Sequence, residues 1–111
     1  LARAFQVAQR ALPGMRARGR GAIGFVGATG SVRGGARTSA FASGKFALRG
    51  LAESLARELG PEGVHVAHFV VDGRIGDDFR AADVADTIVA TLEQRTGWTF
   101  ELDLRPPTGR W

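Results

Sequence analysis

The sequence has 111 residues, 44% of them hydrophobic and 23% charged, and its fifteen basic and eleven acidic side chains give a net charge of +4. This size and composition indicate one globular domain or part of one, and exclude intrinsic disorder, which would need fewer large apolar residues and a greater charge imbalance. The sequence has no run of about 18 apolar residues, so no membrane span is predicted. The basic residues near the start are not arranged as in a signal peptide.

Residues 1–18 carry apolar side chains at helical spacing, which predicts an amphipathic helix that ends at Gly19. No capping residue precedes this helix, so we expect the chain to begin inside a structural element. A short apolar run bounded by glycines, residues 22–26, is typical of a buried strand in a parallel sheet. Residues 27–37 are rich in glycine, serine and threonine and predict a loop after that strand.

Residues 38–59 repeat apolar side chains every three or four positions and predict the longest helix, with a hydroxyl residue at its start as the candidate cap. The β-branched run at residues 64–71 indicates a second buried strand, and residues 83–94 indicate a third helix. Residues 98–104 alternate apolar and polar side chains, as in a half-buried strand. This order predicts an α/β fold: a partial doubly wound, Rossmann-like parallel sheet of about three strands with flanking helices.

The charges are unevenly distributed along the chain. The first 52 residues carry nine basic and no acidic side chains, and the remainder carry six basic and eleven acidic ones. Since basic side chains supply most of the non-specific affinity for nucleic acids, a basic nucleic-acid-binding module is one hypothesis. Arginine outnumbers lysine 14 to 1, however, and no aromatic residues are interleaved as stacking platforms. We therefore interpret the asymmetry as compositional bias and expect no nucleic-acid partner.

Few side chains in this sequence could carry chemistry. The absence of cysteine excludes disulfides, thiolate nucleophiles and cysteine-ligated metal sites, and it favours a cytoplasmic protein. The chain also has no tyrosine and only two histidines, His65 and His68. These lie three apart on a predicted strand and point to opposite faces, and no acid is placed to orient them. We interpret both as hydrogen-bonded residues of the sheet and expect no metal site.

The glycine-rich stretch at residues 29–36 lies between a strand and a helix, where backbone N–H groups can face a phosphate. Two features argue against a dinucleotide-binding turn. Ala36 occupies the place of the final glycine, and no strand ending in an acid follows about 20 residues later. We therefore favour a flexible pocket wall at the end of the strand, and keep phosphate binding as the alternative.

Four short segments follow one another in a characteristic order. They are Gly27-Ala28-Thr29, Phe41-Ala42-Ser43-Gly44-Lys45, Gly60-Pro61-Glu62-Gly63 and Asp72-Gly73. With the elements around them, they resemble the carboxyl-terminal half of the short-chain dehydrogenase/reductase family over nearly the whole chain, most specifically at residues 45–73. The resemblance implies that residues 1–111 are the carboxyl-terminal part of a single Rossmann-like domain, and that the amino-terminal cofactor-binding half is absent.

The resemblance also assigns places to individual residues. The family uses a tyrosine as general acid/base, a lysine four residues after it and a serine thirteen residues before it. Phe41 occupies the tyrosine place, Lys45 the lysine place and Ala28 the serine place, so only the lysine is kept. By the same resemblance, Lys45 would hydrogen-bond the ribose of the cofactor, and Gly73 and Ile75 would lie on its nicotinamide side.

For the complete protein, the resemblance implies an oxidoreductase that depends on NAD or NADP and has non-standard catalytic residues. Its partners would be the nicotinamide cofactor and a small carbonyl or alcohol substrate, and it would form a homo-oligomer through the helices at residues 1–18 and 38–59. The alternative is a non-catalytic cofactor-binding or scaffold homologue that kept the fold and lost the chemistry. Phe41 and Ala28 favour this alternative, because neither side chain carries a hydroxyl, whereas Lys45 favours the enzyme.

Overall fold

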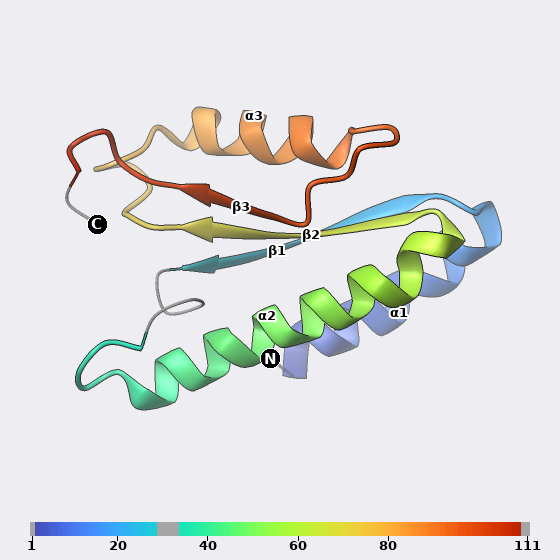
Figure 1. Ribbon diagram of the computed structural model, residues 1–111, viewed down its shortest axis with the longest axis horizontal. Coiled ribbons are helices and arrows are strands. Elements are labelled where there is room, and N and C mark those ends of the chain that lie inside the picture. Colours follow the sequence, from blue (N-terminus) through green and yellow to red (C-terminus); the bar gives the residue numbers. More distant parts are fainter. Residues whose placement is uncertain (1, 29–33, 110–111) are drawn as a thin grey trace.

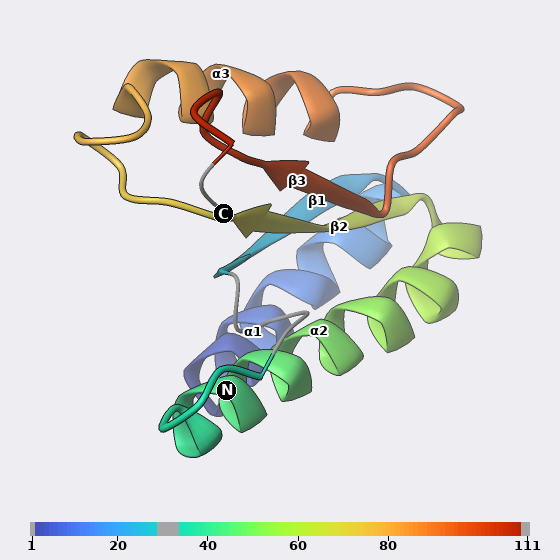
Figure 2. The same cartoon turned by 60° about the vertical axis from the view of Figure 1, so that its left-hand side comes forward.

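The computed structural model describes residues 2–28 and 34–109, which form three layers with a parallel sheet in the middle (Figure 1). In chain order, the elements are α1 (Ala2–Arg18), β1 (Gly21–Ala28), α2 (Ser39–Leu59), the 3-10 helix η2 (Gly60–Glu62), β2 (Val64–Val71), α3 (Ala81–Leu92) and β3 (Glu101–Leu104). Helices α1 and α2 cover one face of the sheet and α3 covers the other, as the turned view in Figure 2 also shows. The predicted partial doubly wound fold is confirmed.

The described strands follow the order β1-β2-β3, and both neighbouring pairs are parallel. Strands β1 and β2 pair over their full lengths, from Gly21 opposite Val64 to Ala28 opposite Val71. A helix connects each strand to the next, as parallel pairing requires. The carboxyl ends of all three strands therefore lie together at one end of the sheet, called here the carboxyl edge. Ligands bind at this end in doubly wound folds.

The boundary of the last strand differs from the prediction. Strand β3 begins at Glu101, three residues later than the alternating pattern indicated. The indole N–H of Trp98 donates to the carbonyl oxygens of Gln94 and Arg95, and the side-chain amide of Gln94 bonds Thr99 through both its oxygen and its nitrogen. These bonds turn the segment back toward the end of α3, so it cannot extend β3.

The start of α2 also differs from the prediction. Thr38 occupies the capping position, but its hydroxyl donates to the carbonyl oxygen of Gly35 and does not cap the helix. The backbone N–H of Ala42 still bonds the Thr38 carbonyl oxygen at 2.7 Å. The hydroxyl therefore stabilises the turn before α2, while the helix begins through its backbone bonds alone.

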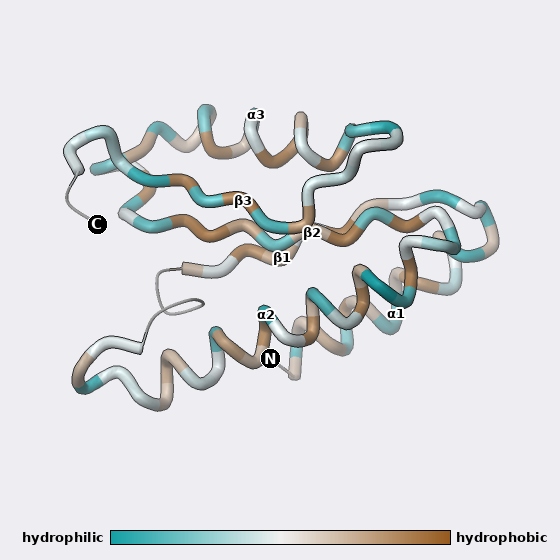
Figure 3. The backbone as a smooth tube through the Cα atoms, viewed as in Figure 1, coloured by the Kyte–Doolittle hydropathy of each residue, from teal (hydrophilic) through white to brown (hydrophobic). Residues whose placement is uncertain are grey.

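The main core lies between the sheet and the pair α1 and α2. Its buried members are Ala8, Phe25, Ala52, Leu59, Val64 and Val66. On the opposite face, the ring of Phe69 is fully buried, and a Cβ at Gly24 would contact both this ring and Leu92 of α3. Every residue of β2 is buried, and the hydropathy colouring of Figure 3 shows that this strand is largely hydrophobic. None of the described helices is both long and apolar enough to cross a membrane.

Candidate active site

The residues assigned by resemblance lie toward the end of the molecule to which the carboxyl ends of the strands point. Ala28 ends β1 directly opposite Val71, the last residue of β2, and Gly73 and Ile75 follow β2. Figure 1 shows that α2 begins on the side toward which the strands point, so Phe41 and Lys45 lie in its first turns. Elements distant in sequence therefore bring all five residues to one end of the molecule.

Phe41 and Lys45 lie one helical turn apart on the same side of α2. The Lys45 ammonium nitrogen is 5.7 Å from the centroid of the Phe41 ring, within range of a cation–π contact. Together with Ala40, Gly44 and Leu48, they line a shallow hollow of about 250 Å³. Phe41 is 55% exposed, so this apolar side chain lies at the surface of α2.

A tight turn follows β2 on the other side of this edge. The Asp78 carboxylate accepts a hydrogen bond from the backbone N–H of Arg74 at 2.8 Å, and the Phe79 carbonyl oxygen accepts one from Gly76 at 2.6 Å. A Cβ at Gly73 would lie only 2.8 Å from the Phe79 ring, so a larger residue here would have to displace that side chain. Ile75 remains 55% exposed and presents an apolar side chain at the edge.

Asp72 lies between β2 and this turn and is buried. Its carboxylate bonds the Arg105 guanidinium at 2.8 Å, and its backbone N–H donates to the carbonyl oxygen of Leu104. Arg105 also bonds Asp103 at 2.9 Å. This ion pair fastens the segment after β3 to the carboxyl edge, and sequence reasoning missed it because 33 residues separate the partners.

The prediction that no acid orients a histidine is wrong for His68. The Nδ1 of this buried ring lies 3.0 Å from Glu101, its neighbour across the β2–β3 pair. Because a carboxylate only accepts hydrogen bonds, Nδ1 carries the proton. His65 has a different partner, since its Nε2 lies 2.8 Å from the Thr99 carbonyl oxygen. Among the described residues, the second ring nitrogen of each histidine has no hydrogen-bond partner. The expectation of hydrogen-bonded sheet histidines is therefore confirmed for one nitrogen of each ring.

Glu101 belongs to an ionic network that links the sheet to α2. Arg49 bonds it twice, at 2.6 and 3.3 Å, and also bonds Glu53 at 2.8 Å. Burial raises the pKa of Glu101, but hydrogen bonds from Arg49 and His68 lower it by more, so the pKa lies below its ordinary value of 4.5. The hydrogen bond to Glu101 likewise raises the pKa of Arg49.

A lowered carboxyl pKa makes the stability of the fold depend on pH. The contribution of Glu101 is complete above its unfolded pKa, and it is lost as the pH falls through the lower folded value. We expect Glu101→Gln to reduce the free energy of unfolding by about 1–2 kcal/mol near neutral pH, and by clearly less at about pH 3. Urea unfolding at both pH values measures this difference. Glu58→Gln removes an exposed carboxylate 3.7 Å from Arg16 and is the control, which should change the free energy of unfolding little. An equal loss at both pH values for Glu101→Gln would contradict the prediction.

Other sequence predictions concern the glycine-rich stretch, metal binding and the assigned catalytic places. Most of the glycine-rich stretch proposed as a pocket wall or phosphate turn, residues 29–33, lies outside the described residues. Among the described residues, no three histidine, aspartate or glutamate side chains come close enough to hold a metal ion. The family's acid/base chemistry needs hydroxyls that Phe41 and Ala28 do not have, so Lys45 is the one polar side chain among the three assigned catalytic places.

Comparisons with known proteins agree with this geometry. The sequence matches the family of short chain dehydrogenases over residues 1–95. A short-chain dehydrogenase from Rhodopseudomonas palustris is 46% identical, with a TM-score of 0.75 over 83% of this chain and 41% of that protein. Serine dehydrogenase from Escherichia coli shares the fold at 21% identity, with a TM-score of 0.84 over 94% of this chain and 48% of that protein.

A metagenomic short-chain oxidoreductase crystallised with NADP has a TM-score of 0.80 at 24% identity, over 92% of this chain and 45% of that protein. The chain thus spans less than half the length of each of these three proteins. The sequence match covers most of the chain, and the order of its helices and strands agrees with it. The chain therefore belongs to the short-chain dehydrogenase family.

Proposed function

We propose that this chain is the carboxyl-terminal part of a Rossmann-like oxidoreductase domain that uses NAD or NADP and has a non-standard catalytic set. The observation that carries the proposal is that α2, whose first turns carry Phe41 and Lys45, begins on the side toward which the strands point. The substrate would be a small carbonyl or alcohol compound. The alternative, a non-catalytic cofactor-binding homologue, is favoured by the missing hydroxyls at Phe41 and Ala28.

The side chains at this edge suit a nicotinamide cofactor. The Lys45 ammonium has no acidic partner among the described residues, so it is available to donate to ribose hydroxyls. Ile75 offers exposed apolar surface, and Gly73 keeps the turn beside it compact. The cofactor, when bound, would supply or accept the hydride. These residues do not discriminate between NAD and NADP.

We expect the 111-residue chain by itself to bind NAD and NADP only weakly. In the family, a glycine-rich turn on the first strand holds the pyrophosphate, and the stretch at residues 29–36 is a poor substitute for it. Calorimetric titration with both cofactors measures the affinity. A dissociation constant in the low micromolar range would overturn the interpretation of residues 29–36 as a poor phosphate-binding turn.

We also expect the chain to self-associate. Strand β1 lies at an edge of the described sheet, where backbone hydrogen-bonding groups are left without a neighbouring strand. Exposed apolar side chains on α1 and α2, among them Val7 and Phe46, offer a second surface for pairing. Because both helices are basic before Glu53, added salt should strengthen the association. Light scattering across salt concentrations tests this, and a uniform species near 11.7 kDa at micromolar concentration and moderate salt would contradict it.

A further inference from the structure

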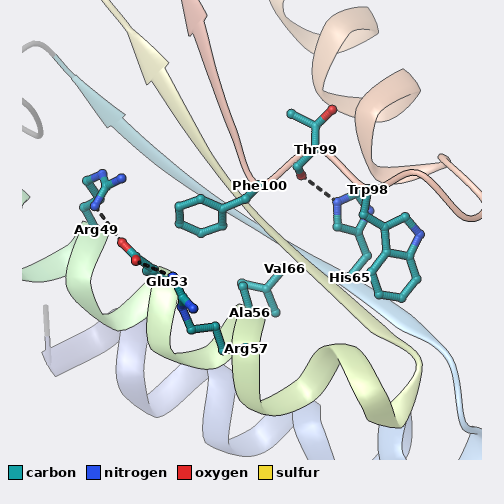
Figure 4. Close-up of a pocket in the computed structure, with 9 residues that line it drawn as sticks. All are labelled: Arg49, Glu53, Ala56, Arg57, His65, Val66, Trp98, Thr99 and Phe100. Carbon is teal, nitrogen blue, oxygen red and sulfur yellow. Dashed lines mark hydrogen bonds and ion pairs between the residues drawn. The ribbon is translucent and has the colours of Figure 1, made fainter.

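A second hollow lies away from the carboxyl edge, near the amino ends of β2 and β3. It has a volume of about 330 Å³ and lies between the second half of α2, the start of β2 and the connection from α3 to β3 (Figure 4). None of the residues assigned to the nicotinamide site lines it. The proposed oxidoreductase function therefore gives this hollow no role.

Its inner surface is largely apolar and aromatic. Ala56 of α2, Val66 of β2 and Phe100, which directly precedes β3, form its floor. The Trp98 ring stacks on His65, with the two centroids 4.9 Å apart and the planes inclined by 7°. Trp98 is fixed further by the hydrogen bonds of its indole N–H. Rigid flat groups of this kind favour a planar ligand that displaces water from the floor.

The hydrogen-bonding groups at the rim are unequally used. Both Glu53 oxygens are bonded, one to Arg49 and the other to Arg57. The Thr99 carbonyl oxygen is taken by His65, and the Arg49 guanidinium is held by Glu53 and Glu101. Within the part of the chain that the structure describes, Arg57, in contrast, makes a single bond, to Glu53 at 3.3 Å, and its side chain is 80% exposed. The main unused capacity at the rim is thus the guanidinium N–H groups of Arg57, which suit an anionic acceptor.

We propose that this hollow binds a small planar aromatic carboxylate. The ring would lie on the floor formed by Ala56, Val66 and Phe100, and the carboxylate would face Arg57 at the rim. A cationic ligand is disfavoured, because the rim carboxylate of Glu53 already pairs with two arginines. The site would be separate from the carboxyl edge, so occupancy of one does not require the other.

Calorimetric titration of the 111-residue chain with 2-naphthoate, and with the neutral 2-naphthamide, tests the proposal. We expect naphthoate to bind with a dissociation constant below about 1 mM and the amide to bind about fivefold more weakly. Arg57→Gln should weaken naphthoate about fivefold and leave the amide unchanged. Ala56→Leu, which fills the floor, should weaken both compounds.

Arg10→Gln is the matched control, since it removes an exposed arginine of α1 outside the hollow. It should leave both affinities unchanged. Equal affinity for naphthoate and the amide would overturn the proposal, as would an equal effect of Arg10→Gln and Arg57→Gln, which would indicate general attraction to a basic surface. Absence of naphthoate binding at millimolar concentration would also overturn it. Because Arg57 is largely exposed, its substitution does not threaten the fold.

Discussion

The double substitution Phe41→Tyr and Ala28→Ser is expected to raise ketone reduction at least about 10²-fold in a protein that carries this chain together with a complete nucleotide-binding half. The tyrosine would place an exchangeable proton beside Lys45, where the Phe41 ring now lies 5.7 Å from the ammonium nitrogen. The serine would add a hydroxyl at the end of β1, at the same edge of the sheet. Steady-state reduction of simple ketones, followed by loss of the reduced cofactor, measures the gain.

Phe46→Tyr is the matched control for this experiment. Phe46 is also exposed on α2, but it lies one position after Lys45 and outside the assigned tyrosine place. This substitution adds the same hydroxyl and should give no gain. The proposal of an altered catalytic set would fail if the unsubstituted protein already turned over ketones at a rate on the order of 10 per second, because another residue would then move the proton.

Gly63→Ala is expected to destabilise the fold by about 3 kcal/mol or more. Gly63 joins η2 to β2 with a φ of 86°, a conformation that is strained for any residue with a Cβ. An added Cβ would also overlap the backbone carbonyl oxygen of Gly19, which cannot move without shifting the chain between α1 and β1. Urea unfolding of both proteins measures the loss.

Gly19→Ala separates the two causes. Gly19 also has a positive φ, of 66°, but a Cβ there would have no atom within 4 Å. Its substitution should therefore cost only the backbone strain, about 1 kcal/mol. If Gly63→Ala cost no more than Gly19→Ala, the overlap with the Gly19 carbonyl oxygen would add nothing to the loss of stability, and the prediction would be wrong.

Local sequence patterns predicted most of the fold. The spacing of apolar residues located α1 and α2, and the β-branched run located β2, because these patterns depend on near neighbours in the chain. The same local logic put Phe41 and Lys45 on one side of a helix, and the structure confirms this placement. The assignment of their roles came from resemblance and stays a prediction.

The sequence by itself thus determined the order of the elements, the parallel sheet and the absence of hydroxyls at two assigned catalytic places. The tertiary structure decided which distant groups meet. The hydrogen bonds of Trp98 turn its segment back toward α3, so β3 is shorter than the local pattern predicted. Glu101 lies beside His68 and Arg49 because β3 pairs with β2 and α2 packs against the sheet, and no local pattern encodes this register. The hydrogen bond between Asp72 and Arg105 likewise depends on how the elements pack. Such pairs depend on how whole elements pack, since packing alone fixes the separation of side chains that lie far apart along the chain.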